Sequence, residues 1–224
     1  MPAVLIERRF PRFTIQVPLL HKTGAPQGNP IGIAWTRNLS EGGACVELTR
    51  PLQPQLPLVL RLQTDRGAIA AGANVVWVGS SGRSGRSIPH GVAFTLLASD
   101  QLQALRKFVA RGKGQGRPDV RLSFEVSVTC QHMGGPPQPP IEGLSGNISR
   151  GGLLLLLPQV LPPGATLELT MHTARGPLVA KGMIVWTESP AGRLVGPPFR
   201  HGLQFSAIGW SALLNLGILL MIPR

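Results

Sequence analysis

Hydrophobic and polar residues alternate along several short segments of this chain, and stretches rich in Gly and Pro separate those segments. Residues 13–17 and 122–128 both alternate with a period of two, which is typical of strands with one buried face. Further strands are predicted at residues 31–36, 44–48, 58–62, 70–78 and 91–96, with equivalents later in the chain such as 141–145. Strands at this spacing predict a mostly β protein built on a small barrel.

The chain contains two copies of one pattern. Most matching positions are displaced by 109 residues, and the segment that starts at His90 recurs at His201 with a displacement of 111. A repeat this long indicates a domain duplication, because each copy is large enough to bury its own core. We therefore expect a first domain at residues 1–111, a Gly-rich linker at 112–116 and a second domain at 117–224.

Each copy ends in a predicted helix. In the first, Ser99 is a suitable N-cap and Gly112 is expected to end the helix, with an apolar face formed by Leu102, Leu105, Phe108 and Val109. In the second, residues 210–222 are apolar nearly all round yet too short to span a bilayer. No transmembrane segment is expected, and this helix is predicted to serve in self-association or partner docking.

Net charge and cysteine content indicate the kind of partner and the cellular compartment. The chain has 22 basic and 10 acidic residues, a formal net charge of +12, which favours an anionic partner. The two cysteines, Cys45 and Cys130, form neither a disulfide framework nor a Cys-x-x-Cys pair, so a reducing compartment fits. The N-terminus does not read as a secretory signal, which favours the cytoplasm.

One constellation of polar residues occurs in both copies: an Arg-x-x-x-Arg segment followed by Asn-x-Ser-x-x-Gly. The planar guanidinium of arginine can form paired hydrogen bonds with a phosphate or with the edge of a guanine. Asn and Ser add short-range hydrogen-bonding groups. Paired glycines allow positive φ and close backbone approach to a ligand. An Asx-type turn beside solvated arginines is the alternative interpretation. The candidate ligand-binding residues are Arg8, Arg9, Arg12, Asn38, Ser40, Gly42 and Gly43, with Arg117, Arg121, Asn147, Ser149, Gly151 and Gly152 in the second copy.

Other residues favour structural roles. Trp77 and Trp186 lie in apolar segments and are predicted to pack in the core, while His90 and His201 are predicted to be hydrogen-bonded structural histidines. Neither a nucleophile motif nor a phosphate-binding loop, a metal-ligand set or a pair of catalytic carboxylates is recognisable. We therefore expect no enzyme activity, no cofactor and no metal.

Together these residues resemble the PilZ domain family. The segments 7–15, 38–43 and 90–94 follow the order and spacing of that family, and the second copy repeats them over nearly the whole chain. The resemblance implies a six-stranded antiparallel β-barrel in each copy and binding of the bacterial second messenger cyclic di-GMP, which family members use in motility, exopolysaccharide and biofilm control. It also implies that the arginines clasp phosphates and guanines, while the Asn, Ser and Gly residues hold a guanine.

The resulting hypothesis is a non-enzymatic cyclic di-GMP receptor that acts through interdomain or partner contacts. A nucleic-acid-binding barrel and a ligand-free interaction scaffold are the alternatives, although the low aromatic content of 5% disfavours nucleic acid. The first copy matches the family best. In the second, Asp119 lies between Arg117 and Arg121, so we predict the tighter site in the first copy.

Overall fold

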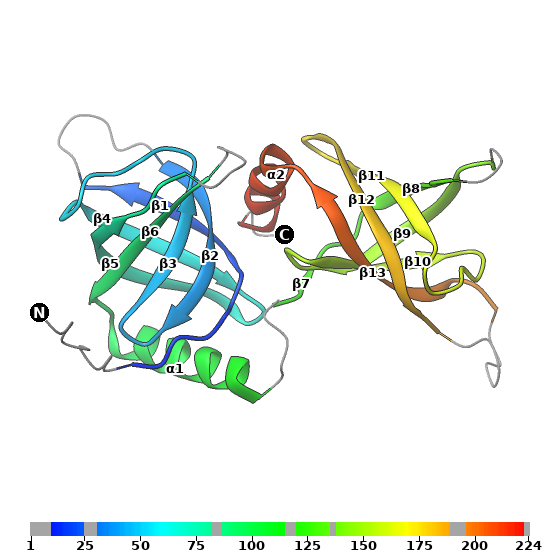
Figure 1. Cartoon of the computed structure of the whole chain (residues 1–224). Coiled ribbons are helices and arrows are strands. Elements are labelled where there is room, and N and C mark those ends of the chain that lie inside the picture. Colours follow the sequence, from blue (N-terminus) through cyan, green and yellow to red (C-terminus); the bar gives the residue numbers. More distant parts are fainter. Residues whose placement is uncertain are drawn as a thin grey trace, which may run out of the picture. The chain divides into compact units, whose positions relative to one another are not determined.

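The chain forms two compact units, Met1–Pro118 and Asp119–Arg224 (Figure 1). The structure is a computed structural model that describes residues 10–24, 31–81, 87–114, 120–134, 138–188 and 196–221. The predicted site residues Arg8, Arg9 and Arg117 lie outside the described residues, as does Asp119. None of the described helices is long and apolar enough to cross a membrane.

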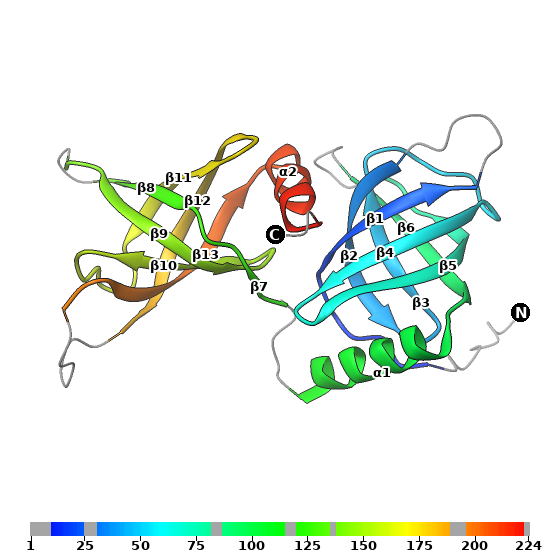
Figure 2. The same cartoon turned by 180° about the vertical axis from the view of Figure 1, so that it is seen from behind.

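The first unit is a closed six-stranded antiparallel barrel followed by a helix. The strands pair in the order β1-β2-β3-β6-β5-β4, and β4 pairs with β1 to close the ring, as the view from behind in Figure 2 shows. The elements are β1 (Pro18–Thr23), β2 (Ile31–Ser40), β3 (Gly43–Leu48), β4 (Pro57–Thr64), β5 (Gly67–Val78), β6 (Ile88–Leu96) and α1 (Ser99–Gly114).

The second unit repeats this barrel. Its ring follows the order β10-β13-β12-β11-β8-β9, and β9 pairs with β10 to close it; the short β7 adds to the end of β9. The elements are β7 (Leu122–Ser123), β8 (Ser127–His132), β9 (Ile141–Ile148), β10 (Gly152–Leu157), β11 (Thr166–Thr173), β12 (Gly176–Thr187), β13 (Phe199–Ile208) and α2 (Trp210–Met221). The two six-stranded barrels, each followed by a helix, confirm the predicted fold class.

The alternating residues of each strand fill the barrel interior. Leu58, Leu60 and Leu62 of β4 are buried while Val59 and Arg61 between them face solvent. Successive side chains of a strand point to opposite faces, so the sequence periodicity directly sets which side chains enter the core. Burial of these apolar side chains is the main term that stabilises each barrel.

A buried hydroxyl holds the segment that leads into each barrel. The predicted strand at residues 13–17 is not a continuous ladder: its Ile15 and Val17 are buried, but Thr36 of β2 binds their backbone through its side chain. Thr36 Oγ1 accepts from Val17 N at 2.9 Å and donates to Ile15 O at 2.6 Å. Ser145 makes the same contacts with Val126 and Phe124 in the second unit. The side chain replaces ladder hydrogen bonds and fixes the chain just after the motif arginine.

Helix α2 begins at Trp210 as predicted, whereas α1 begins at Ser99 itself, with Leu102 N donating to the Ala98 carbonyl oxygen at 2.9 Å, so Ser99 is not its N-cap. Leu105, Phe108 and Val109 of α1 are buried, as expected for its apolar face, but α1 continues to Gly114 and Gly112 does not end it. Helical hydrogen bonding tolerates an internal glycine at a cost of about 1 kcal/mol. In α2, Leu213 and Leu216 are buried and the helix contacts β12.

The two histidines are structural, as predicted. His90 Nε2 accepts a hydrogen bond from Leu52 N at 3.0 Å, which leaves the ring proton on Nδ1, 2.9 Å from the Ile88 carbonyl oxygen. His201 makes the equivalent bonds with Leu161 and Phe199. Both rings are fully buried, and this burial lowers the pKa of each below its ordinary value of 6.5. Each neutral imidazole ring therefore attaches the loop that contains Leu52 or Leu161 to its barrel by a hydrogen bond.

We predict that acid weakens both barrels through these rings. Above about pH 7 the histidines are neutral in the folded and the unfolded chain, so their contribution to stability is complete. As the pH falls through 6.5 the unfolded chain takes up protons first, and the free energy of unfolding decreases until the lowered folded-state pKa is reached.

Urea unfolding at about pH 7.5 and about pH 5.5 checks this prediction. His90→Gln should flatten the pH dependence of the first unit, whereas His172→Gln, at an exposed position of the second unit, is the matched control. Equal pH dependence in wild type and in a His90→Gln/His201→Gln double variant would contradict it.

Candidate ligand site

The motif arginine of the first unit lies beside the end of β2. Phe13 and Leu39 exchange two backbone hydrogen bonds, Phe13 N to Leu39 O at 3.0 Å and Leu39 N to Phe13 O at 2.9 Å. This bridge fixes the residue next to Arg12, while the Arg12 side chain itself is exposed. The Arg12 guanidinium is therefore available to a ligand that lies beside the turn between β2 and β3.

The turn between β2 and β3 is closed by Ser40. Its hydroxyl donates to the Gly43 carbonyl oxygen at 3.0 Å, and Phe94 N of β6 donates to the Gly42 carbonyl oxygen at 3.0 Å. A Cβ on Gly43 would lie 2.2 Å from the Val92 carbonyl oxygen, and one on Gly42 would lie 2.7 Å from the Phe10 ring. Both glycines therefore lie close to β6 and Phe10, whereas close backbone approach to a ligand stays a prediction.

The predicted positive φ is wrong for these glycines. Among the described residues, positive-φ glycines occur at other turns, such as Gly67, and not at Gly42, Gly43, Gly151 or Gly152. The paired glycines are needed because strand β6 and Phe10 leave no room for a side chain, rather than because the turn is left-handed.

The motif asparagine sits at a β-bulge in both units. The register between β2 and β3 shifts between Thr36 and Asn38, and that between β9 and β10 shifts between Ser145 and Ile148, the stretch that contains the equivalent Asn147. A bulge re-aims a side chain out of the regular alternation. The Oδ1 atoms of Asn38 and Asn147 are buried and have no hydrogen-bond partner among the described residues. An unsatisfied buried acceptor costs about 1–3 kcal/mol unless a ligand or water supplies the donor.

A second bulge overturns the prediction for the tryptophans. Alternation along β5 places Trp77 on the buried face with Ala73 and Val75, but the β5–β6 register shifts between Val75 and Trp77. Trp77 consequently lies on the outer face with 39% of its surface exposed, and it packs against Gly91, where a Cβ would be 1.9 Å from its Nε1 atom. Trp186 is also 39% exposed and packs in the same way on Gly202. Both rings are surface residues and not core residues.

All of these features of the first unit except Asn38 meet in one open cavity of about 290 Å³. It brings together the predicted residues Arg12, Ser40, Gly42 and Gly43 with the exposed Trp77. An exposed guanidinium, an exposed aromatic face and a closely packed glycine turn suit a flat, anionic ligand. The remaining lining residues are Phe10, Val76, Gly91, Val92 and Ala93.

Sequence reasoning missed several lining residues. Phe10, Val76 and Gly91 were not singled out, and Trp77 was assigned to the core. The recurrence of Trp and of His-Gly at equivalent positions was visible, but only the bulge explains why a strand tryptophan turns outward over a glycine. Asn38 does not line the cavity itself; it lies on β2, two residues before Ser40.

The second unit repeats the arrangement with two substitutions among the described lining positions, Leu203 for Val92 and Gln204 for Ala93. Arg121 is exposed, Ser149 Oγ lies 3.4 Å from the Gly152 carbonyl oxygen, and a Cβ on Gly152 would be 2.4 Å from the Leu203 carbonyl oxygen. Phe205 N donates to the Gly151 carbonyl oxygen at 2.9 Å. Opposite Gly152, however, β13 carries the exposed Gln204, where β6 carries Ala93 opposite Gly43.

Within the described ranges, no group of three or more metal-ligating side chains occurs. An ion pair joins Arg106 Nε of α1 to Oε2 of Glu41, the residue before Gly42, at 2.8 Å. It neutralises the acidic residue of the β2–β3 turn, which favours an anion beside Gly42.

Several PilZ proteins of known structure match this chain at low sequence identity. The PilZ domain of YcgR from Escherichia coli with c-di-GMP is 15% identical, covers 50% of this chain and 95% of its own, and has a TM-score of 0.41. The Bacillus subtilis inhibitor of motility is 13% identical over 92% of this chain and 95% of its own, with a TM-score of 0.38. The MrkH–c-di-GMP complex of K. pneumonia is 14% identical over 90% and 86%, with a TM-score of 0.37. No curated protein matches this chain.

The family follows from the sequence profile of the PilZ domain, which matches twice, at residues 6–111 and 115–210. The two matches together span most of the chain and coincide with the two barrels. This protein belongs to the PilZ domain family and carries two PilZ domains in tandem.

Proposed function

We propose that this protein is a bacterial cyclic di-GMP receptor without catalytic activity, acting in the cytoplasm. The observation that carries the proposal is the meeting of Arg12, Ser40 and the Gly42–Gly43 turn with an exposed tryptophan in one cavity. Family relatives of known structure include complexes with c-di-GMP. The ligand pairs anionic phosphates with flat guanine bases, and the cavity offers a partner for each.

Each group has a distinct role in this proposal. Arg12, with Arg8 and Arg9, binds phosphate or a guanine edge. Asn38 Oδ1, which lacks a donor in the described structure, accepts from a guanine N–H. Trp77 offers a face for stacking, an interaction that contributes about 0.5–1.5 kcal/mol for aromatic pairs. Ser40, Gly42 and Gly43 hold the turn against which the base lies.

The same roles apply to the second unit, where Arg117 and Arg121 replace the first pair and Asn147, Ser149, Gly151 and Gly152 form the turn. Arg117 belongs to the stretch that joins the two units. A ligand bound by Arg117 and Arg121 therefore fixes part of that stretch, which provides a route from second-messenger concentration to interdomain or partner contacts.

Calorimetric titration of the full chain with cyclic di-GMP tests the proposal. We expect saturable binding that quenches tryptophan fluorescence and that disappears in an Arg12→Ala/Arg121→Ala variant. A random single-stranded oligonucleotide at physiological salt is the parallel arm, because a net charge of +12 also suits nucleic acid. Oligonucleotide binding without cyclic di-GMP binding would replace this function with the nucleic-acid alternative, and binding of neither would leave a scaffold.

The first site should bind cyclic di-GMP more tightly than the second. The first copy contains 13 basic and 5 acidic residues up to Arg111, against 9 and 5 afterwards. The glutamine at 204 also adds an amide side chain directly opposite Gly152, where Ala93 leaves the first cavity open. Charge and available space both favour the first site.

Exchanging the residues at positions 93 and 204 measures how much of the difference in affinity between the two sites is steric. Gln204→Ala should tighten the second site, observed in an Arg12→Ala background, and Ala93→Gln should weaken the first site, observed in an Arg121→Ala background, each by about fivefold or 1 kcal/mol. Asp119→Asn tests the charge part at the second site. Equal affinities of the two sites in the single-site backgrounds would contradict the ranking.

We also propose that α2 pairs with α2 of a second copy. Residues 210–221 contain no charged side chain, and Leu214, Ile218, Leu219 and Leu220 remain partly exposed beside the buried Leu213 and Leu216. An apolar face on a helix suits a two-fold contact, in which the same patch serves on both copies. Sedimentation should show a concentration-dependent dimer that Leu214→Glu/Leu220→Glu abolishes, and a monomeric wild type would contradict the pairing.

A further inference from the structure

A second cavity of the first unit, about 340 Å³ in volume, lies between α1 and the turn that joins β4 to β5. It shares no residue with the cavity that contains Arg12. The helix residues recur every three or four positions and so form one face of α1. The lining comprises Asp100, Gln103, Ala104, Lys107, Phe108 and Arg111 from α1, and Thr64, Arg66, Gly67, Ala68 and Ile69 from the turn and β5.

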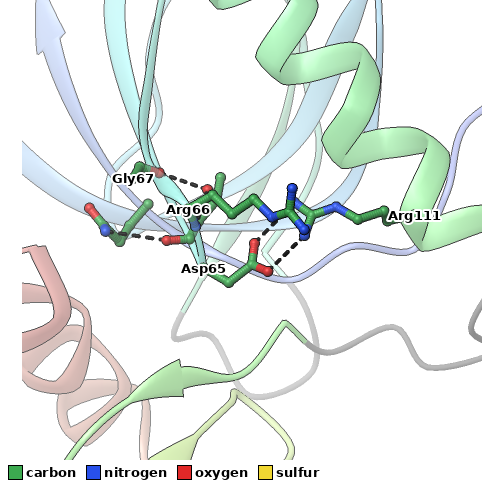
Figure 3. A network of polar contacts seen from close by, with 6 residues as sticks. Asp65, Arg66, Gly67 and Arg111 are labelled. Atoms are coloured by element: carbon green, nitrogen blue, oxygen red, sulfur yellow. Dashed lines mark hydrogen bonds and ion pairs between the residues drawn. The ribbon is translucent and has the colours of Figure 1, made fainter.

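Hydrogen bonds at both ends of this cavity hold α1 against the β4–β5 turn and β5. Arg111 forms two parallel hydrogen bonds with the Asp65 carboxylate, at 2.8 and 3.1 Å, which Figure 3 shows. At the other end, Ala70 N donates to Gln101 Oε1 at 2.9 Å. The turn itself is set by Gly67 with a φ of 112° and by Thr64 Oγ1, which donates to the Gly67 carbonyl oxygen at 2.7 Å. The cavity is therefore part of the folded barrel.

The lining carries three cations, Arg66, Lys107 and Arg111, and one carboxylate, Asp100 in the first turn of α1, so positive charge is in excess. Arg66 and Lys107 have no ion-pair partner within the described part of the chain, whereas Arg111 is neutralised by Asp65. Figure 3 shows the side chains of Arg66 and Arg111 extending toward each other beside Asp65. The Nε atom of Arg111 is buried without a hydrogen-bond acceptor. Two unpaired cations and an orphaned donor beside them match an anion with several acceptor oxygens.

Four side chains of the lining are apolar. Ile69 and Phe108 are buried, and Ala68 and Ala104 complete a floor without polar side chains. A free inorganic anion would use the cations but leave this floor in contact with water, whereas an organic phosphate covers both. We propose that this cavity is a second anion site of the first unit that binds a phosphomonoester of about mononucleotide size.

The second unit supplies a natural contrast. It builds the same turn, with Thr173 Oγ1 donating to the Gly176 carbonyl oxygen at 2.6 Å and Arg175 at the position of Arg66. Ala174 replaces Asp65, however, and α2 contains no charged residue to face the turn. The second unit therefore has no counterpart of the Arg111–Asp65 ion pair or of Lys107, and Arg175 is a matched control for Arg66.

Calorimetric titration of the full chain with guanosine 5′-monophosphate tests this site in an Arg12→Ala/Arg121→Ala background, which removes the candidate cyclic di-GMP sites. We expect binding that Arg66→Ala/Lys107→Ala weakens by about tenfold or more and that Arg175→Ala leaves unchanged. Guanosine, which lacks the phosphate, should not bind. Inorganic phosphate should bind through the same two cations but more weakly, because it does not contact the apolar floor.

The test does not depend on the proposed receptor function, because the two cavities share no residue. Absence of binding at millimolar concentrations of the nucleotide would overturn the site. So would binding that is insensitive to Arg66→Ala/Lys107→Ala, or that Arg175→Ala weakens equally. The thermal unfolding midpoint of each variant, measured without ligand, separates loss of the site from loss of the fold.

Discussion

Replacing Arg12 by alanine should abolish cyclic di-GMP binding at the first site while leaving the barrel folded. The Arg12 side chain is exposed and lines the 290 Å³ cavity, whereas the packing of its segment is carried by the buried Ile15 and Val17. A charge-assisted hydrogen bond contributes about 1.5–3 kcal/mol, and a bidentate contact to phosphate makes two such bonds. Two such bonds amount to about 3 kcal/mol or more, so we expect at least about a hundredfold loss in affinity at this site.

The measurement uses chains in which Arg121→Ala silences the second site, so that only the first is titrated. Arg61→Ala is the matched control, because Arg61 is an exposed arginine of the same barrel that does not line the cavity. Arg12→Lys should restore only part of the affinity, since lysine keeps the charge but not the planar fork. Wild-type affinity in the alanine variant would show that Arg12 does not contact the ligand.

Replacing Gly43 by alanine should damage both the first barrel and its ligand site. The added Cβ would lie 2.2 Å from the Val92 carbonyl oxygen, a backbone atom that cannot move without separating β3 from β6. Overpacking of this kind costs about 1–3 kcal/mol. Because Gly43, Val92 and Ala93 all line the cavity, the same displacement should lower ligand affinity.

Urea unfolding and cyclic di-GMP titration should be run on the same variant. Gly209→Ala is the control, because a Cβ at Gly209 would meet no atom within 4 Å. Gly152→Ala extends the test to the second barrel, where the Cβ would lie 2.4 Å from the Leu203 carbonyl oxygen. Unchanged stability in Gly43→Ala would mean that β3 and β6 have more freedom to separate than their pairing indicates.

Periodicity, duplication and turn chemistry were enough to predict the barrels. Each strand has one face in the core, so alternation such as that of residues 58–62 reports burial directly. The repeat displacement of 109 predicted two units, and the apolar spacing of Leu105, Phe108 and Val109 predicted the face of α1. These features are local in the chain or follow from its self-similarity, which is why they are visible without a structure.

Whether a cavity residue could be predicted depended on whether its neighbours are close to it in the sequence. Arg12, Ser40, Gly42 and Gly43 do line one cavity, since they flank a single turn of β2 and β3. Phe10 and Gly91 were missed because their roles depend on contacts with Gly42 and Trp77, which no sequence pattern specifies. The closeness of β6 to Gly43 likewise depends on strand pairing across about fifty residues.

By itself, then, the sequence determined the number of barrels, the identity of the core faces and the family, because alternation, repetition and motif spacing are written along the chain. Only the tertiary structure decided where Trp77 and Trp186 lie and that Asn38 and Asn147 carry unpaired acceptors. The physical reason is the bulge: one extra residue in a strand reverses which face the following side chains occupy, and its position depends on the partner strand.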